Sequence, residues 1–122
     1  TQEFLQESKD LLTEGGILTA NTFSVSQLYA HESATYKAVF GDFFNVRNSK
    51  HSNRVILTST KDLPSGDVIA KRALTIADKL KPFGINIIDL TTWLTSTKDE
   101  QDWPENTKLL TDQFSPANLL NQ

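Results

Sequence analysis

Two adjacent polar residues, Asn21 and Thr22, follow a short apolar run and offer the groups of a small-molecule contact. An Asn amide carries both a hydrogen-bond donor and an acceptor, so it could position a substrate. If residues 17–20 form a strand of an open α/β sheet, the pair lies at its carboxyl end, where such sheets bind ligands. We therefore predict Asn21 and Thr22 as substrate-binding residues. The alternative is that Asn21 caps the turn that follows, as Asn often does.

The sequence offers no convincing metal site and no activated nucleophile. The two histidines, His31 and His51, are twenty residues apart, and no carboxylate stands at helical ligand spacing from either. Both are expected to be solvated. Cysteine is absent, which removes disulfides, thiolate metal ligands and thiol nucleophiles. No G-x-S-x-G elbow is present, so nucleophilic hydrolysis has no support. We predict no metal, and the catalytic residues stay unassigned.

Acidic residues gather late in the chain, where they could bind a cation or a polyamine. A run of this kind is usually a solvated loop, and that alternative stays open. Further on, Asp112 is of a type that performs acid–base chemistry. Its Thr-Asp-x-x-x-Pro context favours instead a turn that fixes the tail against the sheet. The acidic cluster consists of Asp99, Glu100, Asp102 and Glu105.

The elements that must position these residues alternate between helix and strand. Apolar spacing predicts helices in three stretches and short apolar runs predict three strands. Gly15-Gly16 is expected to end the first helix, because Gly readily takes the left-handed conformation found at helix C-termini. The first predicted helix is 4–12, the second begins at Ser24 or Ser26 and runs to about residue 40, and the third is opened by residues 63–66 and closed by Pro82 and Gly84. The predicted strands are 16–21, 42–47 and 54–60.

Topology follows from the order of these elements. The polar residues 48–53 are predicted to join the last two strands in an antiparallel hairpin. A crossover helix precedes that hairpin, and such a crossover is right-handed. We therefore predict an α/β fold with a mixed, partly parallel sheet, in which strand 54–60 lies between the other two and runs antiparallel to both. Residues 85–94 fit either a short helix capped by Asp89 or an extended segment.

The length, net charge and apolar runs of the chain narrow the class of protein. With 122 residues, the chain fits one small domain. Its net charge of −3 and the absence of a basic block argue against a nucleic-acid partner. No apolar run approaches the roughly 20 residues that a membrane span requires. Residue 1 is Thr and falls at or just inside a helix, which indicates a fragment whose upstream half is not in this sequence.

Residues 4–60 resemble the corresponding part of spermidine synthase and its relatives. In that family a helix ends in a turn similar to Leu12-Thr13-Glu14-Gly15-Gly16, and a strand, a helix with an aromatic-rich end and a strand hairpin follow. Residues 110–116 look like the closing Thr-Asp-x-x-x-Pro element of spermidine synthase-like proteins. The resemblance implies that residues 1–122 are a partial catalytic domain, the C-terminal half of a Rossmann-like methyltransferase fold.

The resemblance also implies a function. The parent protein would transfer an aminopropyl group from decarboxylated S-adenosylmethionine to an amine, with Asn21 helping to position the amine. The family's glycine-rich cofactor loop and catalytic Asp lie upstream of Thr1 in this comparison, so no cofactor is expected to bind this chain. A homo-oligomer is expected. The expected location is the cytoplasm, with the alternative that the chain is the soluble domain of a membrane protein, as in many relatives.

Two departures from the family pattern keep other functions open. Polyamine synthases usually carry Gln where this chain has Asn21, and a Pro-Thr-Tyr-Pro-like segment where residues 46–51 read Val-Arg-Asn-Ser-Lys-His. The cationic Arg47 and Lys50 would repel a polycation unless they point away. The alternatives are methyl transfer from S-adenosylmethionine, a non-catalytic dimerisation or regulatory domain, and, remotely, a nuclease-type domain, for which no strand carries Glu-x-Lys.

Overall fold

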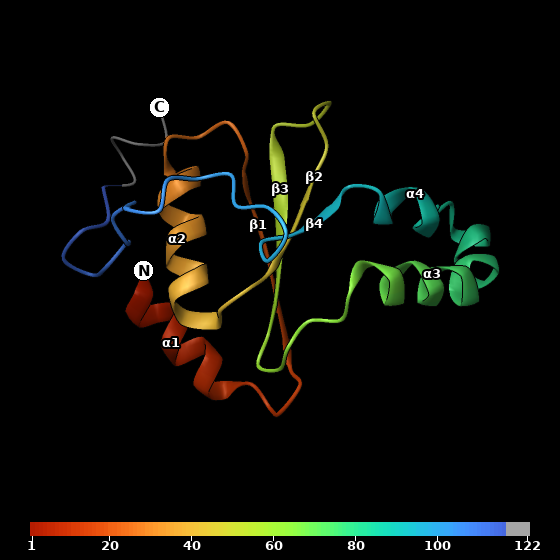
Figure 1. Ribbon diagram of the computed structural model, residues 1–122, viewed down its shortest axis with the longest axis horizontal. Helices are drawn as coiled ribbons and strands as arrows, with labels where there is room; N and C mark the ends of the chain where they lie inside the picture. The colour runs from red at the N-terminus through yellow and green to blue at the C-terminus, as the bar shows by residue number, and fades with distance from the viewer. Residues whose placement is uncertain (117–122) are drawn as a thin grey trace.

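A four-stranded sheet organises the computed structural model, which describes residues 1–116 (Figure 1). The end of the predicted 1–122 domain, residues 117–122, lies outside the described residues. Helices α1 and α2 lie on one side of the sheet, and α3 and α4 extend away from the other side. The elements are α1 (Gln2–Leu11), β1 (Ile17–Phe23), α2 (Leu28–Phe40), β2 (Phe44–Arg47), β3 (Asn53–Ser59), α3 (Gly66–Leu80), the 3₁₀ turn η1 (Lys81–Phe83), α4 (Ile87–Thr91) and β4 (Leu94–Ser96).

Strand order in the sheet is β1-β3-β2-β4. The prediction that residues 54–60 lie between the other two strands, antiparallel to both, is confirmed: Ala20 pairs with Ile56, and Val46 pairs with Val55. The predicted partly parallel sheet is wrong for residues 1–116, where every neighbouring pair is antiparallel. The reason is the return strand β3, which enters between β1 and β2. These two run in the same direction but do not touch.

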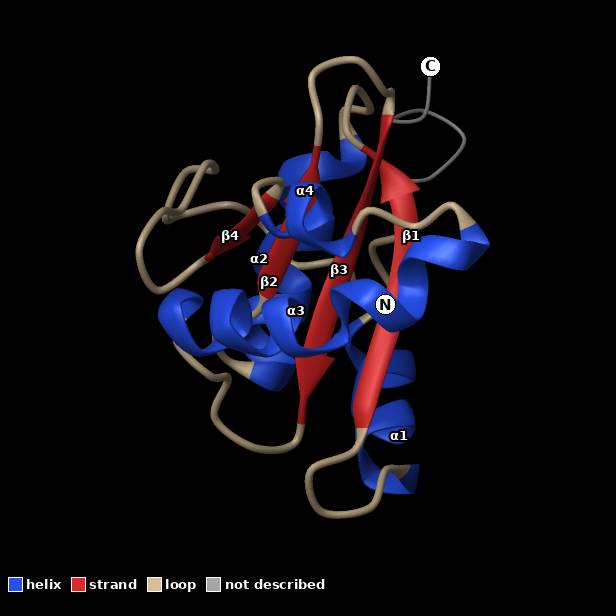
Figure 2. Ribbon diagram, turned by 90° about the vertical axis from the view of Figure 1, so that its right-hand side faces the viewer, coloured by secondary structure: helices blue, strands red, loops and turns tan. Residues whose placement is uncertain are grey.

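The alternation of side chains along the strands separates the sheet into two different faces. One face packs against α2 and the loop after β4, and it holds the core residues Phe43 and Ile56, both fully buried. Trp103 reaches back from that loop and stacks on Phe43 with ring centroids 5.8 Å apart. We call this the helix-covered face. The opposite one, which Figure 2 views with α3 and α4 in front of the sheet, we call the open face.

The prediction that Gly15-Gly16 ends the first helix is wrong. Helix α1 stops at Leu11, and its cap, Leu12, is already extended. Gly15 follows in a turn with φ 75°, a left-handed conformation that favours glycine. A side chain at Gly16 would bring a Cβ to 2.9 Å from the carbonyl oxygen of Thr13. Both glycines therefore serve the turn into β1, where the chain reverses tightly.

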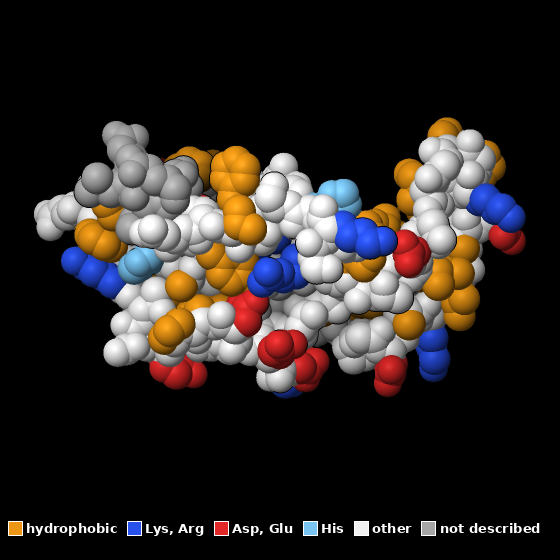
Figure 3. All heavy atoms as spheres, turned by 90° about the horizontal axis from the view of Figure 1, so that it is seen from above, with side chains coloured by type: hydrophobic (Ala, Val, Ile, Leu, Met, Phe, Trp, Pro, Cys, Tyr) orange, Lys and Arg blue, Asp and Glu red, His pale blue; other side chains and the backbone are white. Residues whose placement is uncertain are grey.

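Helices α3 and α4 pack on each other and form an arm, residues 66–91, that projects from the sheet (Figure 1). Hydrophobic side chains gather on its surface (Figure 3), with Leu74 66% and Phe83 78% exposed. The ambiguous residues 85–94 are helical in part, but the cap of α4 is Asn86 and not Asp89, because the Asn86 side chain accepts from the amide of residue 89. Within residues 1–116, no helix is long and apolar enough to cross a membrane.

Candidate functional site

Asn21 lies on the open face, within β1 and not in a turn. The strand continues to Phe23, so the alternative role of Asn21 as a turn cap does not apply. Its Oδ1 accepts a hydrogen bond of 2.9 Å from Asn53 Nδ2, which belongs to the neighbouring strand β3. Both amides are exposed near the carboxyl end of β1. Asn21 Nδ2 and Asn53 Oδ1 have no further partner among residues 1–116, so the pair presents one donor and one acceptor to solvent.

Thr22 lies on the opposite face of the sheet. Successive strand residues point to opposite faces, so the two predicted site residues cannot share one surface. The Thr22 hydroxyl accepts a hydrogen bond of 2.9 Å from Arg54 Nε. Thr22 therefore supports β3 from the helix-covered side, and Asn21 alone reaches the candidate ligand surface.

Arg54 is a buried cation that the sequence interpretation missed. Its side chain has no solvent exposure, although Arg is rarely found fully buried. Nη1 donates to Ser33 Oγ at 2.6 Å and Nη2 donates to the Tyr29 carbonyl at 3.1 Å, while the guanidinium stacks 3.8 Å from the centre of the Tyr29 ring. Side chains alternate between the two faces along β3, so Arg54 lies on the same buried face as Ile56. This alternation was the signal in the sequence that could have predicted the burial of Arg54.

Glu32 is the charged partner of Arg54. Its Oε2 lies 3.5 Å from Arg54 Nη2, and the carboxylate is mostly buried. Burial raises the pKa of Glu32, and the neighbouring guanidinium opposes that shift. Burial likewise lowers the pKa of Arg54, while the nearby Tyr29 and Glu32 raise it. Arg stays charged in proteins, so the ion pair holds the ends of β1, α2 and β3 in one arrangement.

A small hollow of about 160 Å³ adjoins the Asn21–Asn53 pair at the tip of the β2–β3 hairpin. It lies between the hairpin and α4, and the rings of His51 and Trp93 are 6.2 Å apart there. His51 is exposed, as predicted. The neutral amides and aromatic rings can orient a small polar ligand. The His51 imidazole is of a type that transfers protons, but no hydrogen bond among residues 1–116 orients its ring, and the catalytic residues stay unassigned.

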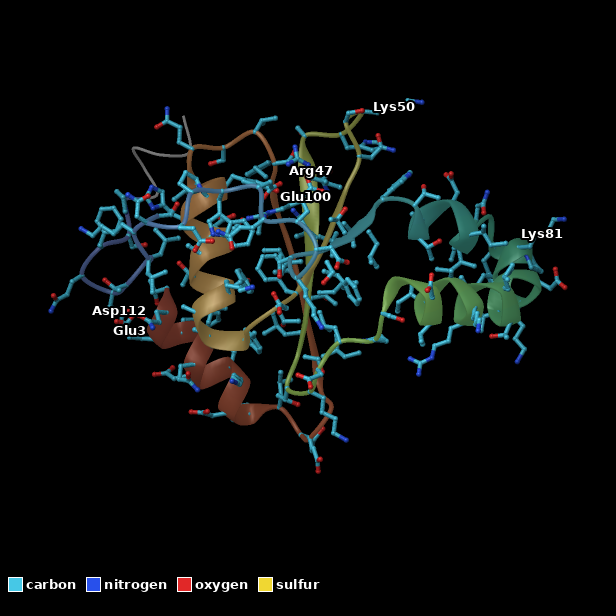
Figure 4. All side chains as sticks on the ribbon, in the orientation of Figure 1. Glu3, Arg47, Lys50, Lys81, Glu100 and Asp112 are labelled. Carbon is cyan, nitrogen blue, oxygen red and sulfur yellow. The ribbon has the colours of Figure 1, made fainter. Side chains whose placement is uncertain are left out.

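Arg47 lines part of this hollow, but its guanidinium is bound on the other side of the sheet. It sits beside β4 on the helix-covered side, where Nη1 lies 3.2 Å from Asp102 Oδ2 and 3.0 Å from the Tyr29 hydroxyl. Lys50 is at the exposed hairpin tip (Figure 4). Because Asp102 pairs with Arg47, the repulsion of a polycation that the sequence suggested is weakened at Arg47 and stays at Lys50.

Two other sequence candidates are structural. The Asp112 turn is present, but it fixes the tail to the start of α1 and not to the sheet: Thr1 Oγ1 donates to Asp112 Oδ1 at 2.7 Å, and the Asp112 amide donates to Glu3 (Figure 4). His31, expected to be solvated, contacts the Lys108 carbonyl oxygen through Nδ1 at 2.7 Å. In the part of the chain that the structure describes, no group of three or more His, Cys, Asp or Glu could hold a metal ion.

Comparison with known proteins gives one clear relative. No family model matches the chain, and no solved structure matches it significantly. A polyamine aminopropyltransferase of Vibrio vulnificus (strain CMCP6) is 50% identical over 121 residues, which cover 98% of this chain and 40% of that protein. The chain therefore spans about two fifths of the length of this relative. On this identity, the chain belongs to the spermidine synthase-like family of polyamine aminopropyltransferases.

Proposed function

We propose that this chain supplies part of the amine-binding surface of a polyamine aminopropyltransferase. The relative that is 50% identical carries that name, and it supports the reaction class. The observation that carries the proposal is the Asn21–Asn53 amide pair, exposed on the open face near the carboxyl end of β1. Thr22 contributes indirectly, by holding Arg54 beneath the same strands.

The topology supports a Rossmann-like methyltransferase fold in the longer protein. β1 and β2 run in the same direction, α2 crosses between them, and β3 fills the gap. Within residues 1–116, β1 pairs on one side only. A further parallel strand on its other side would give the mixed sheet, and the open face would then adjoin the ligand edge.

The proposed reaction forms a bond between an amine nitrogen and the carbon beside a sulfonium, and it breaks the carbon–sulfur bond. Decarboxylated S-adenosylmethionine would supply the aminopropyl group. The Asn21–Asn53 pair can accept a hydrogen bond from the amine and hold its lone pair in line with the reacting carbon. His51 lines the hollow beside Asn53, but the family's catalytic Asp lies upstream of Thr1 in the family comparison, so we propose that the base comes from elsewhere in the protein.

The test is Asn21→Ala in the longer protein, with Thr19→Ala as the control because Thr19 is also exposed and lies on the same face of β1. Asn21→Ala should lower turnover by about 10²-fold if the amide acts on the transition state. It should change the free energy of unfolding by less than about 1 kcal/mol, since its one partner is exposed. Unchanged turnover in Asn21→Ala would remove this residue from the site.

The cofactor proposal has its own test. The sequence carries no glycine-rich loop of the dinucleotide-binding type. We therefore expect calorimetry to detect no micromolar complex between this chain and decarboxylated S-adenosylmethionine or S-adenosylmethionine. Assaying the longer protein with each of the two would separate aminopropyl transfer from methyl transfer.

A non-catalytic dimerisation role is the second candidate, and the exposed apolar surface favours it. Ile17 and Phe23 on β1 are 66% and 59% exposed, and the arm adds more apolar area. A surface of this kind is typical of an interface. We propose a homo-oligomer on this ground. Activity of the longer protein with an amine acceptor would argue against a purely structural role.

A further inference from the structure

A second polar hollow, of about 240 Å³, lies at the opposite edge of the sheet from β1. β2, β4 and the loop that follows β4 form it, with Arg47 and Glu100 next to each other (Figure 4). It is on the helix-covered side, whereas the Asn21–Asn53 pair is on the open face. The residues that line it are Asn45, Arg47, Thr95, Glu100 and Asp102.

The single proton of the Tyr29 hydroxyl fixes the orientation of the Asn45 side-chain amide. The Tyr29 hydroxyl has one proton, which it donates to Asp102 Oδ2 at 2.6 Å. Asn45 Nδ2 and Arg47 Nη1 must therefore be the donors in their contacts with the same hydroxyl, at 2.7 and 3.0 Å. The carbonyl of the Asn45 side chain is the group left over. It is buried with no hydrogen-bond partner, in a residue only 6% exposed.

An unpartnered carbonyl in a buried position is costly, and a ligand that donates to it would recover that cost. Two further groups that line the hollow and can accept a hydrogen bond are also unused. Arg47 and Asp102 neutralise each other as an ion pair at 3.2 Å. The Glu100 carboxylate has neither a hydrogen bond nor an ion pair among residues 1–116, and the hydroxyl of Thr95 is likewise unused. The hollow thus has a net negative charge and three acceptor groups without a partner among residues 1–116.

We propose that this hollow binds the primary ammonium group of a small molecule. An ammonium carries three donors and one positive charge. These match the Asn45 carbonyl, the Thr95 hydroxyl and the Glu100 carboxylate, while a carboxylate or phosphate would be repelled by Glu100 and Asp102. The volume accommodates a short alkyl chain attached to the nitrogen. This site does not depend on the proposed transferase activity, because it shares no residue with the Asn21–Asn53 pair.

The experiment is a titration of the isotope-labelled chain with propylammonium chloride, followed through the backbone amide resonances at constant ionic strength. Saturable shifts should be confined to residues 45–47, 95 and 100–102, with a dissociation constant on the order of 1 mM, since few atoms are in contact. Sodium propionate and propanol, which lack the charge or reverse it, should not produce these shifts. Equal shifts with propionate or propanol, or no saturation with propylammonium, would overturn the proposal.

Variants distinguish a built site from general attraction to acidic residues. Glu100→Gln should weaken propylammonium binding about tenfold, the usual scale of a charge-assisted contact. Glu105→Gln, an exposed acidic residue of the same loop that does not line the hollow, should leave it unchanged. Asn45→Ala should also weaken binding, with circular dichroism confirming the fold. If Glu105→Gln and Glu100→Gln have the same effect, the binding is only surface electrostatics and the site is refuted.

Discussion

The two faces of the sheet come from the same strands but have opposite environments. On the helix-covered face, Phe43 and Ile56 have no exposure and Arg54 has several partners. On the open face, Phe23 is 59% exposed and Asn21 has one exposed partner. The chain closes one face with its own helix and loop. The candidate amine-binding residues lie on the face that residues 1–116 leave open, so the proposed function depends on what covers that face.

The difference also predicts where substitutions matter. Side chains on the helix-covered face are held by several buried partners, and their loss leaves unsatisfied groups or a cavity. Side chains of β1 on the open face lose little when they are truncated, because water already contacts them.

Replacing the buried cation should have the largest effect. Arg54→Met leaves the Glu32 carboxylate mostly buried without its charged partner, and it removes three donors from their acceptors. We expect the free energy of unfolding to fall by about 3–5 kcal/mol, measured by urea denaturation. Arg72→Met on the exposed surface of α3 is the control and should change it by less than about 0.5 kcal/mol. A similar free energy of unfolding for the two variants would show that Arg54 does not stabilise the helix-covered face.

Truncating one Phe from each face compares them directly. Phe43→Ala should lower the free energy of unfolding by about 3 kcal/mol, because Phe43 is fully buried against Trp103. Phe23→Ala should change it by less than about 1 kcal/mol. If the two substitutions cost the same in this chain, Phe23 is covered in solution and the open face is closed by self-association.

Self-association can be probed at the free edge of β1. An exposed strand edge is a template for pairing with another chain, and a charged side chain there opposes pairing. Thr19→Lys places a charge on exposed β1 next to Ile17. We expect it to weaken the association constant by about tenfold in sedimentation equilibrium. Gln6→Lys on the exposed surface of α1 is the control for one added positive charge. A monomeric parent chain would contradict the expectation.

Raising the pH into the alkaline range should have the smallest effect on the free energy of unfolding. The chain has two tyrosines, Tyr29 and Tyr36, and burial raises the pKa of each above the ordinary value of 10.0, with the hydrogen bond to Asp102 adding to the shift of Tyr29. The folded state therefore keeps these protons longer than the unfolded state does. Their contribution to stability is complete below pH 10 and is lost as the pH rises through the raised values.

Tyrosinate absorbance as a function of pH measures this directly. The folded chain should titrate at higher pH than the same chain in urea. Superimposed titration curves would mean that neither hydroxyl is buried, and would place Tyr29 outside the helix-covered face.

Local sequence patterns were enough for the order of the elements. The apolar spacing in α2 and α3 and the polar turn between β2 and β3 are properties of neighbouring residues, and the predicted helices and hairpin follow them closely. Even the central position of β3 was predictable, since a tight hairpin and a crossover helix leave few arrangements. The resemblance to the spermidine synthase-like family, confirmed by the relative, also came from the residues.

Only the tertiary structure decided how these elements meet, because strand pairing and burial depend on residues far apart in the chain. Asn21 and Thr22 are adjacent in sequence, but the extension of β1 to Phe23 places them on opposite faces. From the sequence Arg54 would be expected at the surface, but packing against α2 buries it. The Asn45 side-chain carbonyl is left without a partner because Asn45, Arg47 and Asp102 all bind the hydroxyl of Tyr29. These residues come from separate segments, so no local sequence pattern predicts the network.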